Sequence, residues 1–185
     1  LATAVQKHTQ PVHKITIVPR TMGSLGYTMQ MPEEEHYLMS KEEITEQIVT
    51  LLSGRTAEEI IFNTITTGAA NDIERATELA RAMVTKFGMS ESFDMMALEK
   101  NSNMYLEGKT AMLCSDATGS KADYEALEII KDCHKKATEL LSANIDKLHK
   151  IAAFLIEKET ITGEQFMELF NEKDEQSEEN NITEE

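Results

Sequence analysis

The apolar and polar positions divide the chain into a short strand-rich part near the N-terminus and a longer helical part. Residues 1–8 resemble the end of a helix, and residues 13–18 then form a run rich in β-branched side chains. Pro19 ends this run, because proline cannot donate to a central β-ladder. Residues 27–31 predict a second short strand, which ends before Pro32. Two strands of this length indicate a small hairpin or sheet that cannot stand alone.

From Ser40 onward the apolar residues recur with helical spacing. Ser40 and Glu43 match the capping box, in which two side chains bind the free N–H groups at a helix start. Gly54 fits the C′ position, so we expect this first helix to end there. The pattern then predicts a short helix over residues 56–62, a loop over 64–68, and a helix over 71–87 whose apolar stripe includes Ile73 and Phe87.

The second half of the helical part is less regular at its start. Residues 89–119 show no sustained period, and we expect an irregular segment there. A helix is predicted to begin at Ser120 and to break at residues 142–144. Its expected apolar side consists of Tyr124, Leu127, Ile130, Ala137, Leu140 and Leu141. The remaining predicted elements are an amphipathic helix over 145–155 and a short helix that Thr162 caps and that ends at Phe170. The expected fold class is mainly α, with a small β-hairpin or sheet near the N-terminus.

Composition adds a strong negative charge to this picture. The 185 residues include 33 acidic and 18 basic side chains, which gives a net charge of −15. Such a surface repels phosphate backbones and anionic lipids, so we expect no nucleic-acid partner. Residues 171–185 hold seven acids, one lysine and a single large apolar residue, Ile182. This segment cannot bury enough surface to offset its ordering entropy, so we expect one domain over residues 1–170 and an acidic disordered tail after it.

The cysteines and the apolar runs bear on the cellular setting. Cys114 and Cys133 form no CxxC pair and fit free thiols in a reducing compartment. No apolar run approaches the roughly 18–20 residues that span a bilayer, and no signal-peptide pattern is present. The chain begins with Leu1 rather than Met. We therefore expect a piece of a longer protein that is soluble by itself.

Composition and spacing alone yield no catalytic site. None of the five histidines pairs with another at the i, i+4 spacing that places two metal ligands on one helix face. Each histidine is expected to be a surface or packed residue. The chain contains no nucleophile elbow and no glycine-rich phosphate loop. Carboxylate pairs such as Glu58 and Glu59 are expected on solvated helix faces.

Several longer segments have a more specific pattern. Residues 66–81 read Thr-Thr-Gly-Ala-Ala-Asn-Asp-Ile-Glu-Arg-Ala-Thr-Glu-Leu-Ala-Arg, and residues 13–20, 51–60 and 83–90 form further blocks. In this order and spacing the blocks closely resemble the peptidase domain of the FtsH family, the membrane-bound AAA+ zinc proteases. Residues 157–160 match as well.

The resemblance implies a role for Asp72. In that family two histidines of a His-Glu-x-x-His helix and one aspartate hold the zinc, and the glutamate is the general base. The aspartate matches Asp72, the expected metal ligand here; without the resemblance, Asp72 would be an acid favoured by the helix dipole. No His-Glu-x-x-His occurs in these residues, and in relatives it lies directly before this region. The resemblance therefore implies no catalytic residue in this chain, no tight zinc binding, and no peptidase activity of the chain alone.

The resemblance also implies a place for substrate. The second predicted strand, around Gly26, Tyr27 and Thr28, resembles the family's strand beside the active site. An edge strand there could hold an extended peptide through main-chain hydrogen bonds, a mode that tolerates many sequences. An ordinary hairpin strand is the alternative interpretation.

Further expectations follow from the family. The resemblance implies unfolded protein substrates, a homo-hexamer and an upstream module that uses ATP. It also implies upstream anchors in a membrane. This is either the cell membrane, with this domain on its cytoplasmic side, or an organelle inner membrane. A different class stays open: a catalytically dead helical oligomerisation scaffold related to the family. The Asn71-Asp72 pair favours an active parent, because a scaffold needs no third ligand. A helical adaptor unrelated to proteolysis fits the ordered blocks poorly.

Overall fold

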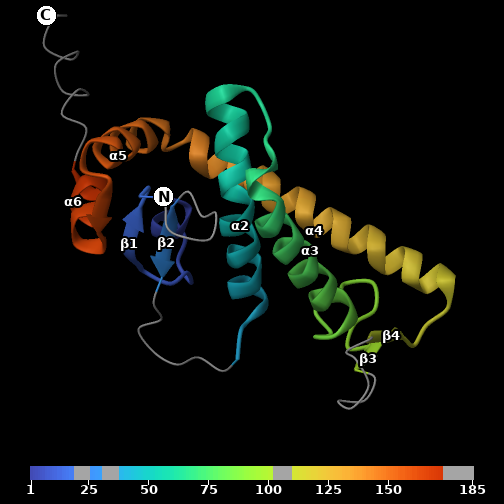
Figure 1. The fold of residues 1–185 in the computed structure, drawn as a ribbon. Helices are drawn as coiled ribbons and strands as arrows, with labels where there is room; N and C mark the ends of the chain where they lie inside the picture. Colours follow the sequence, from blue (N-terminus) through green and yellow to red (C-terminus); the bar gives the residue numbers. More distant parts are fainter. Residues whose placement is uncertain (19–25, 31–37, 102–109, 173–185) are drawn as a thin grey trace, which may run out of the picture. The chain divides into compact units, whose positions relative to one another are not determined.

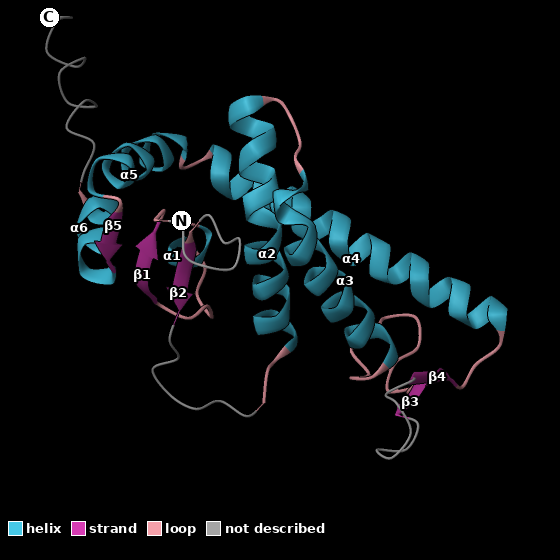
Figure 2. Ribbon diagram, viewed as in Figure 1, coloured by secondary structure: helices cyan, strands magenta, loops and turns pink. Residues whose placement is uncertain are grey.

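The computed structural model describes residues 1–18, 26–30, 38–101 and 110–172. They divide into two compact units, a helical unit (1–9 and 34–143) and a sheet unit (10–33 and 144–185), and each is described by itself. The described residues form six α-helices, one 3-10 helix and five short strands. Figures 1 and 2 show the helices and strands as ribbons. The predicted class, mainly α with a small sheet near the N-terminus, is confirmed. The prediction of one domain with a disordered tail stays a prediction, and residues 173–185 lie outside the described part.

The helical unit is built on three packed helices, which Figure 1 shows crossing one another. Its α-helices are α1 (Ala2–Val5), α2 (Lys41–Phe62), α3 (Ala70–Thr85) and α4 (Asp116–Ser142), and its other elements are the 3-10 helix η1 (Thr67–Ala69) and the strands β3 (Glu99–Asn101) and β4 (Thr110–Met112). No described helix is long and apolar enough to cross a membrane.

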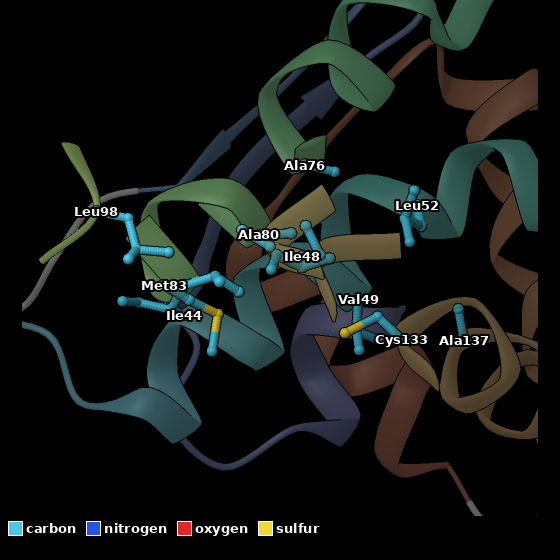
Figure 3. Packing of buried hydrophobic residues seen from close by; sticks show 13 residues of the cluster. Ile44, Ile48, Val49, Leu52, Ala76, Ala80, Met83, Leu98, Cys133 and Ala137 are labelled. Carbon is cyan, nitrogen blue, oxygen red and sulfur yellow. The ribbon is translucent and has the colours of Figure 1, made fainter. Parts of the chain in front are cut away.

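The core between α2, α3 and α4 combines large and small side chains (Figure 3). Helix α2 supplies mainly Ile and Leu, whereas α3 and α4 supply several alanines that let the helices approach closely. Ile48 is fully buried at the centre. The buried cluster consists of Ile44, Ile48, Val49, Leu52, Ala76, Ala80, Met83, Val84, Leu98, Ala122, Ala126, Cys133 and Ala137.

Helix α2 starts as predicted but does not end at Gly54. The backbone N–H of Glu43 donates to Ser40 Oγ at 3.2 Å, and that of Ser40 donates to the Glu43 carboxylate at 2.6 Å, so the capping box is confirmed. The predicted end was wrong, because α2 continues to Phe62 and is capped by Asn63 at φ 49°. Thr56, two residues beyond Gly54, is fully buried. Packing on both sides of the glycine therefore outweighs its helix penalty of about 1 kcal/mol.

Helix α4 begins earlier than predicted and turns a different face to the core. The Ser115 hydroxyl accepts from Thr118 N–H at 3.4 Å, and the helix starts at Asp116 rather than at Ser120. Tyr124 is 71% exposed and Leu127 46% exposed, so their placement on the apolar side was wrong, whereas Ala137 and Leu141 are buried as predicted. The small residues Ala122, Ala126 and Cys133 also face the core, because they fit the narrow space beside α2 and α3.

Two other predictions for the helical unit differ from the structure. Ile73 and Phe87 are 38% and 51% exposed, although both were placed on the apolar stripe of α3. The segment over residues 89–119 was expected to be irregular, and it contains the paired strands β3 and β4 and the first turn of α4.

The sheet unit contains one antiparallel three-stranded sheet with two helices. The sheet has the order β2 (Tyr27–Gln30), β1 (Val12–Thr16), β5 (Thr160–Thr162), and the helices are α5 (Ile145–Lys158) and α6 (Gly163–Asn171). The predicted break between α4 and α5 at residues 142–144 is confirmed. So is the Thr162 cap, whose hydroxyl accepts from Gln165 N–H at 3.3 Å. Strand β5 was not predicted.

A glycine permits the close packing of α6 on β1. A Cβ at Gly163 would lie 2.0 Å from the carbonyl oxygen of Val12, so no side chain fits there. Ile161 and Phe166, on either side of this glycine, are fully buried. The sheet unit therefore depends on a backbone-to-backbone approach that only glycine allows.

Candidate metal centre

Asp72 lies in the first turn of α3 and is half-buried. Its carboxylate forms no hydrogen bond or ion pair within the part of the chain that the structure describes. A negative charge is favourable at a helix N-terminus, so the position needs no counter-ion to be stable. The side chain is therefore available as an oxygen ligand, a donor type that zinc accepts.

The described residues do not form a complete metal site. No group of three or more His, Cys, Asp or Glu side chains that could hold a metal occurs among residues 1–18, 26–30, 38–101 and 110–172. His8 Nδ1 lies 3.0 Å from Glu46 Oε1, and His134 Nε2 lies 3.1 Å from Glu59 Oε2. His13 and His149 are exposed. A metal site that includes Asp72 would need further ligands from outside the described residues.

The loop that leads into α3 is attached to α2 through Glu58. The backbone N–H of Thr66 donates to Glu58 Oε2 at 3.0 Å, and the Thr66 hydroxyl donates to Glu58 Oε1 at 2.8 Å. These two hydrogen bonds, the one from the hydroxyl first, lower the pKa of the Glu58 carboxyl, and the charge of Arg55 lowers it further. Glu58 is therefore a charged acceptor for the loop.

Arg55 joins the same loop to the rest of the helical unit. Its Nη1 donates to the carbonyl oxygen of Thr66 at 2.7 Å, and its Nε donates to Glu59 Oε1 at 3.2 Å. The other oxygen of Glu59 lies 3.1 Å from His134 Nε2 on α4. One guanidinium thus connects α2 and the loop, and through Glu59 it reaches α4.

This network corrects the expectation that Glu58 and Glu59 lie on a solvated face. Both carboxylates have specific partners, because the loop and α4 return to that face of α2. Sequence reasoning missed Arg55, Glu58 and Thr66 as a group. The spacing of Arg55 to the acids at i+3 and i+4 was a signal for ion pairs, but not for the contact with Thr66.

The predicted substrate residues Gly26, Tyr27 and Thr28 lie in the sheet unit. Tyr27 and Thr28 begin β2 and pair with residues of β1, and β2 is an outer strand of the described sheet. A Cβ at Gly26 would lie 2.5 Å from the carbonyl oxygen of Thr16, so this glycine is needed for strand packing. Asp72 lies in the other unit, and the structure defines each position within its own unit. Substrate binding at these three residues stays a prediction.

The family model described as Peptidase family M41 matches residues 1–169. The chain therefore belongs to peptidase family M41. The resemblance of its sequence blocks to FtsH-type peptidase domains is thereby confirmed.

Similar proteins named ATP-dependent zinc metalloprotease FtsH occur in several bacteria. The chain is 58% identical to the protein of Clostridium perfringens over 169 residues, which cover 91% of this chain and 24% of the relative. It is 51% identical to the protein of Lancefieldella parvula over 166 residues, covering 90% of this chain and 26% of the relative. The relative FtsH 4 of Synechocystis sp. is 45% identical over 176 residues, covering 93% of this chain and 28% of the relative. The chain thus spans about a quarter of the length of these curated relatives.

Proposed function

We propose that the chain is the downstream part of the proteolytic domain of an ATP-dependent, membrane-anchored zinc metalloendopeptidase, with Asp72 as the third zinc ligand. The observation that supports this most directly is the Asp72 carboxylate itself. It lies half-buried in the first turn of α3 without a partner in the described residues, inside the block that resembles the family's third-ligand segment. Membership of the peptidase family and the names of the relatives support the reaction class.

A zinc ion held there would supply Lewis-acid activation of water for peptide hydrolysis. Asp72 would supply one carboxylate ligand and, by its charge, partly balance the charge of the ion. Two histidine ligands and a general base are also required, and the 185 residues contain no His-Glu-x-x-His. Because the chain spans about a quarter of its relatives, we place that motif in a segment upstream of residue 1.

The first experiment is to determine the coding sequence directly upstream of Leu1. The proposal predicts a His-Glu-x-x-His motif within the last few codons before it. If the two histidines or the glutamate are missing there, the parent is a catalytically dead oligomerisation scaffold. A companion experiment incubates the pure 185-residue chain with casein and zinc. We expect no hydrolysis, and hydrolysis that a chelator abolishes would contradict the assignment of the catalytic groups to another segment.

We further propose that β2 binds extended, unfolded protein substrates through main-chain hydrogen bonds. Its place as an outer strand and the exposure of Thr28 and Met29 support this mode. In the complete enzyme, Tyr27→Pro should reduce turnover of an unfolded substrate with little loss of zinc, because proline disrupts the strand with which the peptide would pair. Thr28→Val is the matched control, since it keeps the backbone donor and should retain turnover. Unchanged turnover in Tyr27→Pro contradicts this role.

The remaining parts of the proposed function concern the longer protein. A homo-hexamer, an ATP-driven unfolding module and membrane anchors are proposed from the relatives' ATP-dependent protease names and from the family resemblance. The proposed location is the cell membrane, with this domain on the cytoplasmic side, or an organelle inner membrane. Sedimentation of the full-length protein with and without ATP tests the assembly.

A further inference from the structure

The N–H, the carbonyl oxygen and the hydroxyl of Thr66 all form hydrogen bonds. Side chains of α2 supply every partner except the N–H of Gly68. Glu58 accepts from the Thr66 N–H at 3.0 Å and from its hydroxyl at 2.8 Å, and Arg55 donates to its carbonyl oxygen at 2.7 Å. The Thr66 hydroxyl in turn accepts from the Gly68 N–H at 3.2 Å. Two side chains of one helix turn therefore determine where Thr66 lies.

The position of Thr66 determines how α3 begins. Thr66 is the N-cap of η1 (Thr67–Ala69), and η1 continues directly into α3 at Ala70. The N-cap residue of α3 is Ala69, which has no side chain able to cap the helix. Thr66 therefore caps the 3-10 helix from which α3 continues, and Asp72 is the third residue of α3.

The surroundings limit how far this loop can move without the network. Phe62 and Ile65, which flank the connection from α2, are 70% and 60% exposed and so add little packing. Ala69 is buried, but its methyl group is small. The hydrogen bond that Arg55 donates and the two that Glu58 accepts are thus the main restraints on residues 64–68 among the described contacts.

We infer that Arg55 and Glu58 are positioning residues: through Thr66 they fix the first turn of α3 and thereby the direction of the Asp72 carboxylate. The statement about zinc rests on the proposed function, whereas the statement about the loop does not. A ligand carboxylate must be held in a narrow range of geometry for tight metal binding, and groups behind the ligand commonly provide this. Neither Arg55 nor Glu58 touches Asp72, so they act only through the loop.

The loop is tested first, by amide hydrogen exchange of the 185-residue chain. In Glu58→Gln one acceptor oxygen becomes an amide donor that opposes the Thr66 donors, and we expect exchange at Thr66, Gly68 and Ala70 to rise about tenfold. Thr66→Val removes the hydroxyl and should have the same direction, whereas Thr66→Ser keeps it and should behave as the wild type. Arg81→Ala is the matched control, because it removes a 2.9 Å ion pair from α3 to Asp123 that does not involve the loop.

Two results overturn the inference about the loop. One is unchanged exchange at residues 66–70 in both Glu58→Gln and Thr66→Val. The other is an increase spread equally over the buried amides of α2 and α4, which indicates general destabilisation. If Glu58→Gln does not fold, Thr66→Val decides the question alone, since it changes only an exposed side chain.

Zinc affinity of the full-length protein is the second measurement, by competition with a chromogenic chelator. We expect Glu58→Gln and Arg55→Lys to weaken zinc binding about tenfold, and Arg81→Ala to leave it unchanged. Asp72→Asn separates the two hypotheses. If it leaves zinc affinity intact, the proposed ligand is wrong while the result on loop exchange stands. If it abolishes binding and Glu58→Gln has no effect, Asp72 is the ligand and the positioning role is overturned.

Discussion

The two units of this chain are stabilised in different ways. In the helical unit, long side chains of α2 interlock with small ones of α3 and α4, and charged side chains bind the connecting loop. In the sheet unit, backbone approaches backbone at Gly26 and Gly163, where a Cβ would lie 2.5 Å and 2.0 Å from a carbonyl oxygen. The same difference applies to the two candidate functional segments. Side-chain hydrogen bonds hold the loop before Asp72, whereas backbone pairing with β1 holds Tyr27 and Thr28.

The difference predicts different sensitivities. Backbone packing in the sheet unit tolerates changes of charge but not an added carbon atom, whereas the helical unit tolerates added atoms at open positions and responds to lost volume or lost charge. A metal ligand must point in one direction, and a network of side-chain hydrogen bonds can hold it there. A segment that binds many peptide sequences needs only a defined backbone.

The largest expected effect is that of Gly163→Ala. Its methyl group would overlap the carbonyl oxygen of Val12, which belongs to a strand and cannot move freely, so we expect a loss of about 3 kcal/mol. Urea unfolding followed by circular dichroism measures it. The matched control is Gly54→Ala, because a Cβ there meets nothing within 4 Å and α2 should gain about 1 kcal/mol. Equal effects of the two changes would remove the distinction between the units.

A smaller loss is expected from Ile48→Val in the helical core. Ile48 is fully buried between α2, α3 and α4, and removal of one methylene group should cost about 1 kcal/mol. Ile156→Val on α5 is the control, since Ile156 is 72% exposed and its change should be close to neutral. The same urea unfolding experiment compares them, and a neutral Ile48→Val would show that the core is loosely packed.

The reactivity of the two cysteines measures how well the helical unit excludes solvent from its core. Cys133 is 1% exposed, and burial raises the pKa of its thiol to about 11. Because the thiolate is the reactive form, alkylation of Cys133 at pH 8 should be about a hundredfold slower than that of an ordinary exposed thiol. Mass spectrometry of iodoacetamide-treated chain distinguishes it from Cys114, which is partly exposed. Equal rates for the two thiols would show that the unit opens readily.

The smallest effect concerns pH and the turn after α3. Glu125 accepts from the Ser90 hydroxyl at 2.9 Å and from the Glu91 N–H at 3.0 Å. Partial burial acts to raise the pKa of Glu125, but these hydrogen bonds outweigh it and the pKa lies below its usual range. The stabilisation is therefore present above the unfolded-state pKa of about 4.3 and is lost as the pH falls through the lower folded-state value.

Residue-specific hydrogen exchange, normalised for its intrinsic pH dependence, measures this loss. Protection of the Glu91 and Phe93 amides should fall below about pH 4 in the wild type. In Ser90→Ala protection should already be low at neutral pH, because the Ser90 hydroxyl also accepts from Phe93 N–H at 2.9 Å. Protection that is independent of pH would contradict the role of Glu125.

Features specified by neighbouring residues could be predicted from the sequence. The Ser40 and Thr162 caps, the break between α4 and α5, and the mainly α class depend on short spacings and were confirmed. Gly54 and Tyr124 were mispredicted because packing, not local propensity, determines the end of α2 and the core face of α4. Strand β5 is three residues long and pairs with β1 across most of the chain, which no local pattern reveals.

The candidate metal centre shows the same limit. Asp72 was predicted through resemblance of a long block, since an acid in a first helix turn is common by itself. The partners of its loop could not be predicted, because Arg55 and Glu58 reach Thr66 only after the chain reverses direction beyond Phe62. A spacing pattern detects contacts within a helix and misses contacts across a loop.

The most direct test is the zinc content of the full-length protein, measured by atomic absorption for the wild type and for Asp72→Asn after dialysis against a weak chelator. We expect stoichiometric zinc in the wild type and its loss in the variant, with the core amides of α2 and α3 still protected from exchange. Retention of zinc by Asp72→Asn at the wild-type affinity would contradict the assignment of Asp72 as a ligand.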